Sequence, residues 1–271
     1  MKRLAMDDRQ FHRLLDFLGL SWQGYRKVRK GVKKRLDRHM QDLGCRDMRS
    51  YLAQLAQGGE AERQIERVMS VSISRFFRDQ RLWEVLEKRI LPELIETCLG
   101  RVKVWSAGCA CGEEVCSLKI LWDQMSRTNA NLPLLDITAT DLNPLYLKRA
   151  KAAVYSRSSL KDVQDDLMAS CFQVKRGGKQ FILKPGLRTG ITWVTHNFFS
   201  GPPGAGFHLI FIRNNLLTYY KEERTAPVLN EIINALSVGG CMVIGSHETF
   251  ASQASALQLD PSLPYVFRKE G

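Results

Sequence analysis

Long apolar runs are missing from this chain of 271 residues. No segment approaches the roughly 20 apolar residues of a transmembrane helix, which excludes a helical membrane protein. The first residues (MKR) lead into Asp7 and Asp8 rather than into the apolar core of a signal peptide. Internal repeats and low-complexity segments are also missing. The sequence therefore predicts a cytoplasmic globular protein without membrane insertion.

Paired cysteine motifs are absent as well. The seven cysteines are an odd number without the spacing of a disulfide framework, so we expect reduced thiols. Cys109, Cys111 and Cys116 lie close in sequence, but zinc sites use Cys-x-x-Cys pairs or nearby histidines, which this segment lacks. We expect these three side chains to fill space in a loop, and we expect no metal site.

An acidic excess is the third missing feature. The chain carries 40 Lys and Arg against 28 Asp and Glu, which gives a net charge of +12. One expected helix concentrates this excess, with Asp37 as its only acidic residue. It is either a solubilising helix face or a docking surface for an acidic protein, with nucleic acid as the third alternative. Its basic side chains are Arg26, Lys27, Arg29, Lys30, Lys33, Lys34, Arg35 and Arg38.

The features that the sequence does contain divide it into a helical part and an α/β part. From Asp7 to Gly58 the apolar residues recur at helical spacing, and residues 60–72 are typical of a further helix. The chain is long enough for one large domain and a small one. We therefore expect an all-helical N-terminal domain over residues 1–75 and an α/β domain over residues 76–271.

The segment Val102–Leu118 (VKVWSAGCACGEEVCSL) is predicted to form a strand, a glycine loop and a helix. Small residues in the loop let backbone N–H groups approach a ligand closely. Glu113 and Glu114 then open the helix, where the helix dipole favours carboxylates even without a functional role. The next predicted strand, residues 136–140, ends in Asp141. A doubly wound sheet presents a carboxylate to ribose hydroxyls at this position.

Later segments extend the pattern. Residues 207–212 (FHLIFI) are continuously apolar, as in a strand buried on both faces of a parallel sheet, and residues 241–245 form the next strand. Residues 172–183 alternate around Gly177-Gly178, which predicts a hairpin. The predicted fold class is therefore α/β, a Rossmann-like doubly wound sheet with a small N-terminal helical domain and an antiparallel β-subdomain inserted at about residues 165–192.

Five motifs, in this order, resemble the CheR family of S-adenosylmethionine-dependent chemotaxis receptor methyltransferases. They are Ser74–Asp79 (SRFFRD), Trp105–Glu114 (WSAGCACGEE), Ala139–Asn143 (ATDLN), Phe207–Asn214 (FHLIFIRN) and Gly239–Phe250 (GGCMVIGSHETF). The resemblance covers about residues 10–250 and implies a class I methyltransferase fold. It also implies S-adenosyl-L-methionine as the methyl donor and S-adenosyl-L-homocysteine as the product. The inserted subdomain is then either a docking surface for a partner protein or a lid over the sheet edge.

The resemblance further implies donor-binding residues around the glycine loop and the strand ends. They are Ala107, Gly108, Cys109, Gly112, Glu113, Asp141, Leu142, Asn197, Phe198, Arg213 and Asn214. Within this set, Glu113 is expected to bind the methionine amino group, Asp141 to bind the ribose, and Asn197 to lie near the adenine. The implied catalytic residues are Arg213, Tyr219 and Arg78.

Methyl transfer to a glutamate side chain needs no general base, because a pKa of about 4.3 leaves the carboxylate ionised at neutral pH. It needs a cation that orients the carboxylate, and Arg213 at the end of its predicted strand is placed for that role. The alternative role for Arg213 is a structural ion pair with a nearby carboxylate.

Some positions depart from the family pattern. The family usually places a tyrosine five residues after the strand-end arginine, and here that position is Thr218. Tyr219 is our candidate for the equivalent ring, with Tyr220 beside it. Cys111 stands where serine is common, and His247-Glu248 inverts the usual order of that motif. These departures leave donor binding intact and keep the identity of the acceptor open.

The leading hypothesis is a protein-glutamate O-methyltransferase that acts on an acidic helical protein, such as the cytoplasmic domain of a chemoreceptor. The basic segment Arg26 to Arg38 and the β-subdomain would dock this protein. One alternative keeps the fold and donor but has a different protein or a small molecule as acceptor. Another is a sensory module that binds the donor without turnover. Nucleic-acid methylation is the weakest hypothesis, because the adenine-methylase-like residues 143–146 (NPLY) follow the second strand rather than the fourth.

Overall fold

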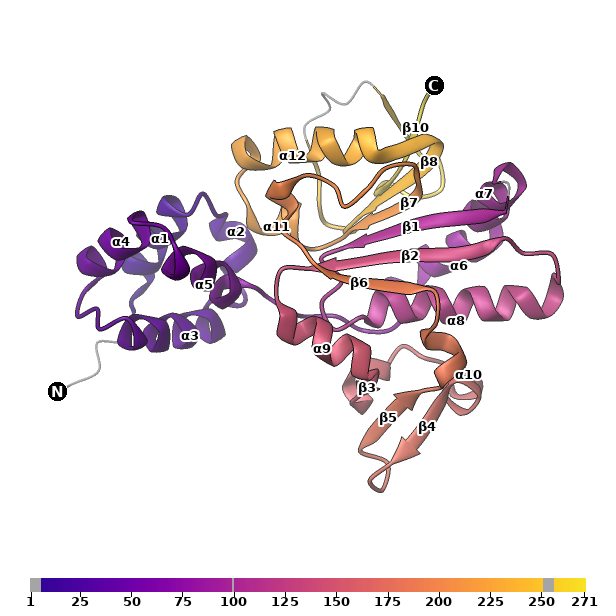
Figure 1. Cartoon of the computed structure of the whole chain (residues 1–271), viewed down its shortest axis with the longest axis horizontal. Coiled ribbons are helices and arrows are strands. Elements are labelled where there is room, and N and C mark those ends of the chain that lie inside the picture. Colours follow the sequence, from indigo (N-terminus) through magenta and orange to yellow (C-terminus); the bar gives the residue numbers. More distant parts are fainter. Residues whose placement is uncertain (1–5, 99, 251–255) are drawn as a thin grey trace. The chain divides into compact units, whose positions relative to one another are not determined.

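The computed structural model describes residues 6–98, 100–250 and 256–271, and its chain divides into two compact units (Figure 1). The first, which we call the helical unit, joins Met1–Val71 to Asn214–Pro227. The second, the sheet unit, joins Ser72–Arg213 to Val228–Gly271. The boundary expected after residue 75 lies four residues beyond the one observed. No pattern in the sequence indicated that a segment after residue 213 belongs with the N-terminal helices.

Among the described residues, six helices lie wholly within the helical unit, and their apolar faces meet in one core. Asp7 and Asp47 each cap a helix, with reciprocal hydrogen bonds to the third residue of that helix. Phe11, Leu36 and Tyr51 are fully buried at the helical spacing predicted from the sequence. The helices are α1 (Asp8–Phe17), α2 (Trp22–Tyr25), α3 (Arg29–Asp42), α4 (Met48–Ala56), α5 (Glu60–Met69) and α11 (Leu216–Tyr219).

Helix α11 joins this unit because Gly24 lets the chain approach α2 closely. A Cβ atom at Gly24 would lie 2.1 Å from the carbonyl oxygen of Thr218, so a larger residue there would push α11 away. The backbone N–H of Ser21 donates to the carbonyl of Tyr219 over 2.9 Å. The Tyr219 ring lies 4.9 Å from the ring of Tyr25, between ring centroids. Tyr219 is therefore an integral part of the helical unit's packing.

A seven-stranded sheet forms the centre of the sheet unit, in the order β6-β2-β1-β7-β8-β10-β9. The first five strands of this order are parallel, and β10 runs antiparallel to both its neighbours. Counted along the main sheet, the parallel strands have the order 3-2-1-4-5 of a doubly wound fold. This confirms the predicted α/β class. The strands are β1 (Arg101–Ala107), β2 (Leu134–Asp141), β6 (Ile191–Thr195), β7 (Phe207–Ile212), β8 (Leu236–Ile244), β9 (Leu257–Leu259) and β10 (Val266–Lys269).

Helices connect these strands, and α8 runs alongside the sheet in Figure 1. The fully buried side chains of β1 and β7 include Val104, Trp105 and Phe211, as expected for central strands covered on both faces. Within the described residues, no helix combines the length and the apolar character needed to cross a membrane. The helices are α6 (Gln80–Val85), the π-helical turn η1 (Leu86–Ile90), α7 (Leu91–Thr97), α8 (Glu113–Thr128), α9 (Pro144–Ala152), α10 (Asp165–Cys171) and α12 (Glu222–Ala235), which begins in the helical unit. Short 3₁₀ turns are η2 (Arg157–Leu160), η3 (Pro185–Arg188) and η4 (Phe198–Ser200).

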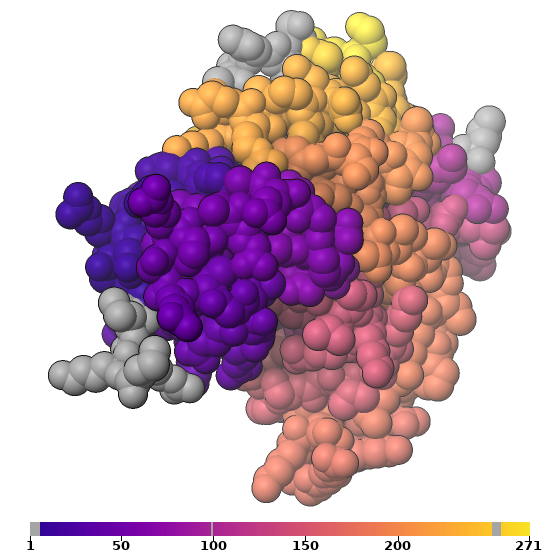
Figure 2. Space-filling model, turned by 60° about the vertical axis from the view of Figure 1, so that its left-hand side comes forward, coloured from indigo at the N-terminus to yellow at the C-terminus, as the bar shows by residue number. Residues whose placement is uncertain are grey.

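An inserted antiparallel sheet lies between α9 and β6, in the order β3-β5-β4. Its strands are β3 (Val154–Tyr155), β4 (Phe172–Lys175) and β5 (Gln180–Leu183). The hairpin predicted around Gly177-Gly178 is present, and it forms a protruding lobe at the lower end of the view in Figure 2. The insertion starts earlier than the predicted residue 165, because β3 pairs with β5. It ends before Ile191, which belongs to β6 of the main sheet.

An ion-pair network around the buried carboxylate of Asp260 fixes the antiparallel edge of the main sheet. Arg89 in η1 forms a hydrogen bond with the carboxylate of Asp260, which also accepts one from the Ser262 backbone over 2.9 Å. Arg268 in β10 pairs with Glu93 of α7. The Asp260 side chain is 1% exposed. Burial alone would raise the pKa of Asp260, but the hydrogen bonds from Arg89 and Ser262 outweigh it and lower that pKa.

We expect Asp260→Asn to lower the free energy of unfolding by about 1.5–3 kcal/mol at pH 7, because a charge-assisted hydrogen bond in a buried site is lost. A carboxyl group with a lowered folded-state pKa stabilises the fold above its unfolded pKa, and this stabilisation is lost as the pH falls through the folded pKa. The difference between the two proteins should therefore shrink below about pH 3.8. Urea unfolding at pH 7 and pH 3 measures both effects.

The matched control is Asp136→Asn. Asp136 pairs with Arg101 over 2.8 Å at an exposed position, and such pairs contribute less than about 1 kcal/mol. Equal stabilities of the Asp260 variant and the wild type at pH 7 would contradict a structural role for this network.

Candidate active site

The glycine loop between β1 and α8 is tied to the end of β2. The backbone N–H groups of Gly108 and Cys109 both donate to the carbonyl oxygen of Thr140, each over 2.8 Å. The N–H of Ala110 donates to Asp141 Oδ2 over 2.9 Å, and the N–H of Asn143 donates to Asp141 Oδ1 over 2.8 Å. Ala107, which ends β1 directly before this loop, is buried. The loop and the acidic end of β2 therefore form one hydrogen-bonded structure.

Asp141 is buried, and burial raises the pKa of its carboxyl group although the two backbone hydrogen bonds oppose this rise. An ionised carboxylate has about four lone-pair positions, and the backbone uses two of them. Asp141 thus keeps the capacity to accept hydrogen bonds from a vicinal diol such as a ribose.

Gly112 ends the loop in a left-handed conformation with φ of +85° and caps α8. A Cβ atom there would lie 2.8 Å from Trp193 Cη2 and 3.0 Å from the Cβ of Ala150. Both the backbone angle and the crowding require glycine at this position. The first residue of α8 is consequently held directly against the end of the loop.

That first residue, Glu113, is 5% exposed. Its Oε1 accepts a hydrogen bond from the Ser159 hydroxyl over 3.4 Å, whereas its Oε2 is buried without a hydrogen-bond partner. Burial raises the pKa of Glu113, and hydrogen bonds, including one from Ser74, oppose the rise. A buried carboxylate oxygen without a partner costs free energy, so it fits a ligand with an ammonium group.

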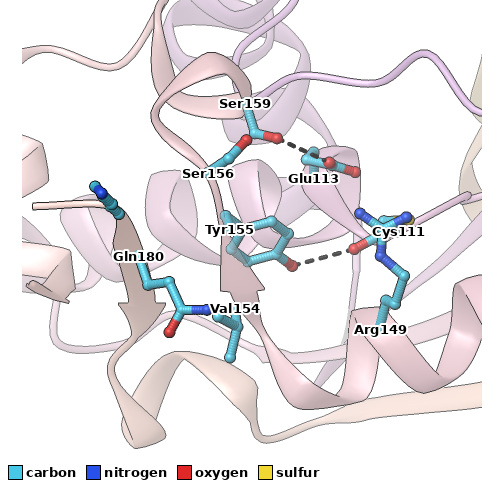
Figure 3. Close-up of a pocket in the computed structure, with 9 residues that line it drawn as sticks. Cys111, Glu113, Arg149, Val154, Tyr155, Ser156, Ser159 and Gln180 are labelled. Atoms are coloured by element: carbon cyan, nitrogen blue, oxygen red, sulfur yellow. Dashed lines mark hydrogen bonds between the residues drawn. The ribbon is translucent and has the colours of Figure 1, made fainter. Parts of the chain in front are cut away.

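A cavity of about 230 Å³ lies beside Glu113, between the glycine loop and the inserted sheet (Figure 3). Tyr155 lines the cavity, and its hydroxyl donates to the carbonyl of Cys111 over 3.2 Å. Exposed Arg149 and Lys179 add two positive charges opposite the buried carboxylate. The lining residues are Cys111, Glu113, Arg149, Val154, Tyr155, Ser156, Ser159, Lys179 and Gln180.

Arg213 directly follows β7, and carboxylates hold both its terminal nitrogens. Nη1 donates to Glu114 Oε2 over 3.0 Å, and Nη2 donates to Asp79 Oδ2 over 2.5 Å. The other oxygen of Glu114 accepts from the hydroxyl of Ser106 over 2.8 Å. The structure therefore shows Arg213 in structural ion pairs, which is the alternative role that we considered from the sequence. Its role in orienting an acceptor carboxylate stays a prediction.

The SRFFRD motif supplies Asp79 from a tight loop. Phe77 and Asp79 both have left-handed backbones, with φ of +50° and +63°, which is uncommon for side chains of this size. The N–H of Phe77 donates to the hydroxyl of Ser117 in α8 over 2.9 Å. Arg78 is half-buried, and burial and the nearby charge of Arg213 lower its pKa. The two predicted cations, Arg78 and Arg213, therefore lie close together.

The remaining residues that we predicted to bind the donor lie at the ends of β2 and β6. The N–H of His196, just after β6, donates to the carbonyl of Asp141 over 3.1 Å. Asn197 follows and caps η4 by accepting from the Phe199 N–H over 3.1 Å. Leu142 and Phe198 are partly exposed at the same strand ends. The structure thus groups these residues at the edge expected for a ligand of a doubly wound sheet.

Asn214 and Tyr219 belong to the helical unit, whereas the other predicted site residues belong to the sheet unit. Asn214 follows Arg213 directly in the chain and has a left-handed backbone with φ of +54°. Sequence reasoning missed Ser106 and Ser159, which hydrogen-bond to Glu114 and Glu113. Ser159 lies 46 residues from its partner in a segment without a motif, so nothing in the sequence pointed to it.

The residues at this edge have the chemistry to bind an organic ligand. Within the described ranges, no group of three or more His, Cys, Asp or Glu side chains is arranged to hold a metal. The unpaired Glu113 oxygen, the narrow glycine loop and the available lone pairs of Asp141 fit an amino-acid nucleoside such as S-adenosylmethionine.

Comparison with known proteins gives consistent matches. Residues 72–265 match the family model of the CheR methyltransferase SAM-binding domain. The chain is 33% identical over 187 residues to a chemotaxis protein methyltransferase of Listeria innocua, covering 69% of each chain. It is 29% identical over 241 residues to chemotaxis protein methyltransferase 1 of Pseudomonas aeruginosa, covering 87% of each. A TehB-like SAM-dependent methyltransferase of Corynebacterium glutamicum aligns with 70% of this chain and 95% of its own. The TM-score of this alignment is 0.38, and the sequence identity is 17%.

We expect Gly112→Ala to destabilise the protein more than Gly178→Ala. Both glycines have φ of +85°, but a Cβ at Gly178 meets no atom within 4 Å, so the pair separates crowding from backbone strain. The crowding against Trp193 should add about 1–3 kcal/mol of destabilisation at Gly112. Chemical denaturation measures the difference, and calorimetry with S-adenosylhomocysteine should show weaker binding for the Gly112 variant alone. Equal effects of the two substitutions would mean that the loop tolerates a side chain.

Proposed function

Because this chain belongs to the CheR methyltransferase family, we propose that it methylates glutamate side chains of an acidic helical protein such as a chemoreceptor. It is an S-adenosylmethionine-dependent methyltransferase. The observation that carries the proposal is the guanidinium of Arg213, which binds carboxylates through both terminal nitrogens at the ligand edge of the sheet. A guanidinium that binds carboxylates at this edge has the chemistry to bind another from an acceptor, and Nε of Arg213 has no hydrogen-bond partner.

The donor-binding role of the sheet unit rests on residues around the glycine loop. When bound, S-adenosylmethionine supplies an electrophilic methyl group on a sulfonium. Glu113 would accept hydrogen bonds from the amino group of the donor, since its Oε2 is buried and unpaired. Asp141 would accept from the ribose, and the segment from Gly108 to Gly112 would lie against the donor with its backbone. Asn197 would lie near the adenine.

The acceptor chemistry needs orientation rather than deprotonation. A glutamate with a pKa of about 4.3 is ionised at neutral pH, so these residues need not remove a proton. Arg213 and Arg78 would orient the carboxylate and offset its loss of water. Tyr219 would help to position the acceptor, although its ring in this structure packs on Tyr25 within the helical unit.

The helical unit offers a surface for an acidic partner. Arg29 and Lys33 pair with Asp8, and Arg35 donates to the backbone of Val68 and Ser70, so these three side chains have structural partners. A different row of α3, which we call the basic stripe, is exposed and follows i, i+4, i+8 spacing. It consists of Lys30, Lys34 and Arg38.

Like charges four residues apart disfavour a helix, so the basic stripe weakens α3 unless something else compensates. An acidic helical partner would compensate by charge complementarity. The protruding hairpin of the β-subdomain is a second candidate docking surface. A chemoreceptor's cytoplasmic domain as partner, and a cytoplasmic location for this chain, are part of the same proposal.

The experiment that tests the function uses the full chain, donor labelled in its methyl group, and a purified cytoplasmic fragment of a chemoreceptor. Label that enters the fragment and is released as methanol by base would support a glutamate methyl ester. Base-stable label would indicate another acceptor atom. Donor binding without labelling of this fragment or of a cell lysate would favour the sensory-module alternative.

We expect Glu113→Gln to weaken binding of S-adenosylhomocysteine by about ten- to a hundredfold, because a charge-assisted hydrogen bond to the amino group is lost. Asp123→Asn is the control, since Asp123 lies on the same helix and pairs with Arg127 away from the loop. Isothermal titration calorimetry measures both affinities. An unchanged affinity of the Glu113 variant would remove this residue from the donor site.

We expect reversal of the basic stripe to glutamate, Lys30→Glu with Lys34→Glu and Arg38→Glu, to raise the KM for the chemoreceptor fragment. It should also flatten the salt dependence of KM, because fewer charge pairs remain to be screened. The control reverses three exposed cations of α1 and α4, Arg9, Arg13 and Arg49, and so makes the same change in net charge. If both triple variants behave alike, only net charge matters and the stripe has no docking role.

A further inference from the structure

Arg213 forms ion pairs with two carboxylates. Its side chain is 4% exposed, so it needs at least one anionic partner to remain charged in the protein interior. It has two, Asp79 and Glu114, and its Nη2 also donates to the carbonyl of Arg78 over 3.3 Å. Half-buried Arg78 is a second cation beside these groups, and Asp79 and Glu114 both favour its charged form. The two carboxylates therefore balance two arginines, and they differ in how each is held.

The two carboxylates differ in how firmly they are held. Glu114 lies in the first turn of α8, where the helix dipole favours it, and its second oxygen is fixed by buried Ser106. Its side chain is 16% exposed. Asp79 has a side chain that is 27% exposed and a left-handed backbone, which an aspartate adopts only at a cost in free energy. Glu114 is the fixed partner and Asp79 the one more easily exchanged.

The hydrogen bonds of Arg213 also differ in quality. Nε and Nη2 form one edge of the planar guanidinium, and a carboxylate can bind both nitrogens of such an edge at once. Asp79 binds Nη2 alone, and Nε is buried without a hydrogen-bond partner. Asp79 therefore uses half of an edge that a better-placed carboxylate could use completely.

We propose that Asp79 is a placeholder for the acceptor carboxylate, and that Glu114 is a positioning residue that fixes the plane of Arg213. This inference rests on the proposed function, because it takes the acceptor group to be a carboxylate. The incoming glutamate replaces Asp79 on the Nε and Nη2 edge, while Nη1 stays on Glu114. One carboxylate replaces another, so Arg213 keeps its charge and never lacks a buried partner. Asp79 moves toward solvent, which its exposure permits.

The test uses Asp79→Asn, with Asp162→Asn as the matched control. Asp162 pairs with Arg75 over 3.3 Å, and its side chain is 24% exposed, close to the exposure of Asp79. The probe is a single glutamate capped at both ends, so that its side chain carries its only charge. Binding is followed by NMR of the arginine side-chain N–H groups. The amide of the Asp79 variant competes less well for Arg213, so affinity for the probe should rise by about three- to tenfold.

Kinetics with the chemoreceptor fragment separate the two roles. Asp79→Asn should lower KM with little change in kcat, whereas Glu114→Gln should lower kcat because the guanidinium plane is no longer fixed. Calorimetry should show donor affinity unchanged in both variants. A purely structural role for Asp79 would instead weaken both binding and turnover. Should Asp79→Asn fail to fold, Asp79→Ser makes the same test.

Probe affinity that is unchanged or weaker in the Asp79 variant would overturn the placeholder role. This failure differs from failure of the proposed function. If wild-type protein forms base-labile esters while the Asp79 variant binds the probe no better, the function stands and the placeholder does not. If the variant binds the probe more tightly but no ester forms on any protein, the placeholder stands and the acceptor carboxylate belongs to a small molecule rather than to a protein.

Discussion

The hydrogen bonds between the glycine loop and the end of β2 are the interaction on which the candidate site depends. Near the end of a parallel strand each carbonyl group needs a partner, and the loop supplies two N–H groups to the carbonyl of Thr140. The same closure brings Ala110 to the carboxylate of Asp141 and sets Glu113 at the start of α8. Gly112 is the position where this closure tolerates no side chain, because Trp193 from β6 packs against it. A local turn thus decides where both predicted donor carboxylates lie.

The second constraint is that buried charges need hydrogen-bond partners, and the charged groups of the site differ in how completely they are paired. Asp141 has two backbone N–H partners, and Arg213 has two carboxylates. Glu113 has hydrogen bonds from serine side chains, and its Oε2 is unpaired. Folding alone would favour a complete set of partners at every buried charge. Incomplete pairing at Glu113 and at Nε of Arg213 therefore marks the places where a ligand would lower the free energy of the site.

The two units divide the chemistry of the protein between them. The sheet unit holds the glycine loop, the acidic strand end and the arginine pair, while the helical unit holds the basic stripe. The chain returns to the helical unit immediately after Arg213, so Asn214–Pro227 fold with the N-terminal helices. The strand-end arginine and the tyrosine proposed to position the acceptor are therefore joined by a short covalent connection, although they belong to different cores.

The sequence by itself determined the features that depend on short-range order. Apolar periodicity predicted the helices of the N-terminal part, a continuous apolar run predicted the buried strand β7, and glycine at residues 177–178 predicted the hairpin. Each of these patterns reflects the conformation of neighbouring residues. The resemblance of five motifs predicted the family and, with it, the methyltransferase fold. Only the tertiary structure decided which side chains pair across the fold. Asp79 and Arg213 are 134 residues apart, and Glu114 and Arg213 are 99 residues apart, so no local pattern records that they meet. Packing also decided that Tyr219 lies on Tyr25, since that contact depends on the absence of a side chain at Gly24 rather than on any preference of the tyrosine itself.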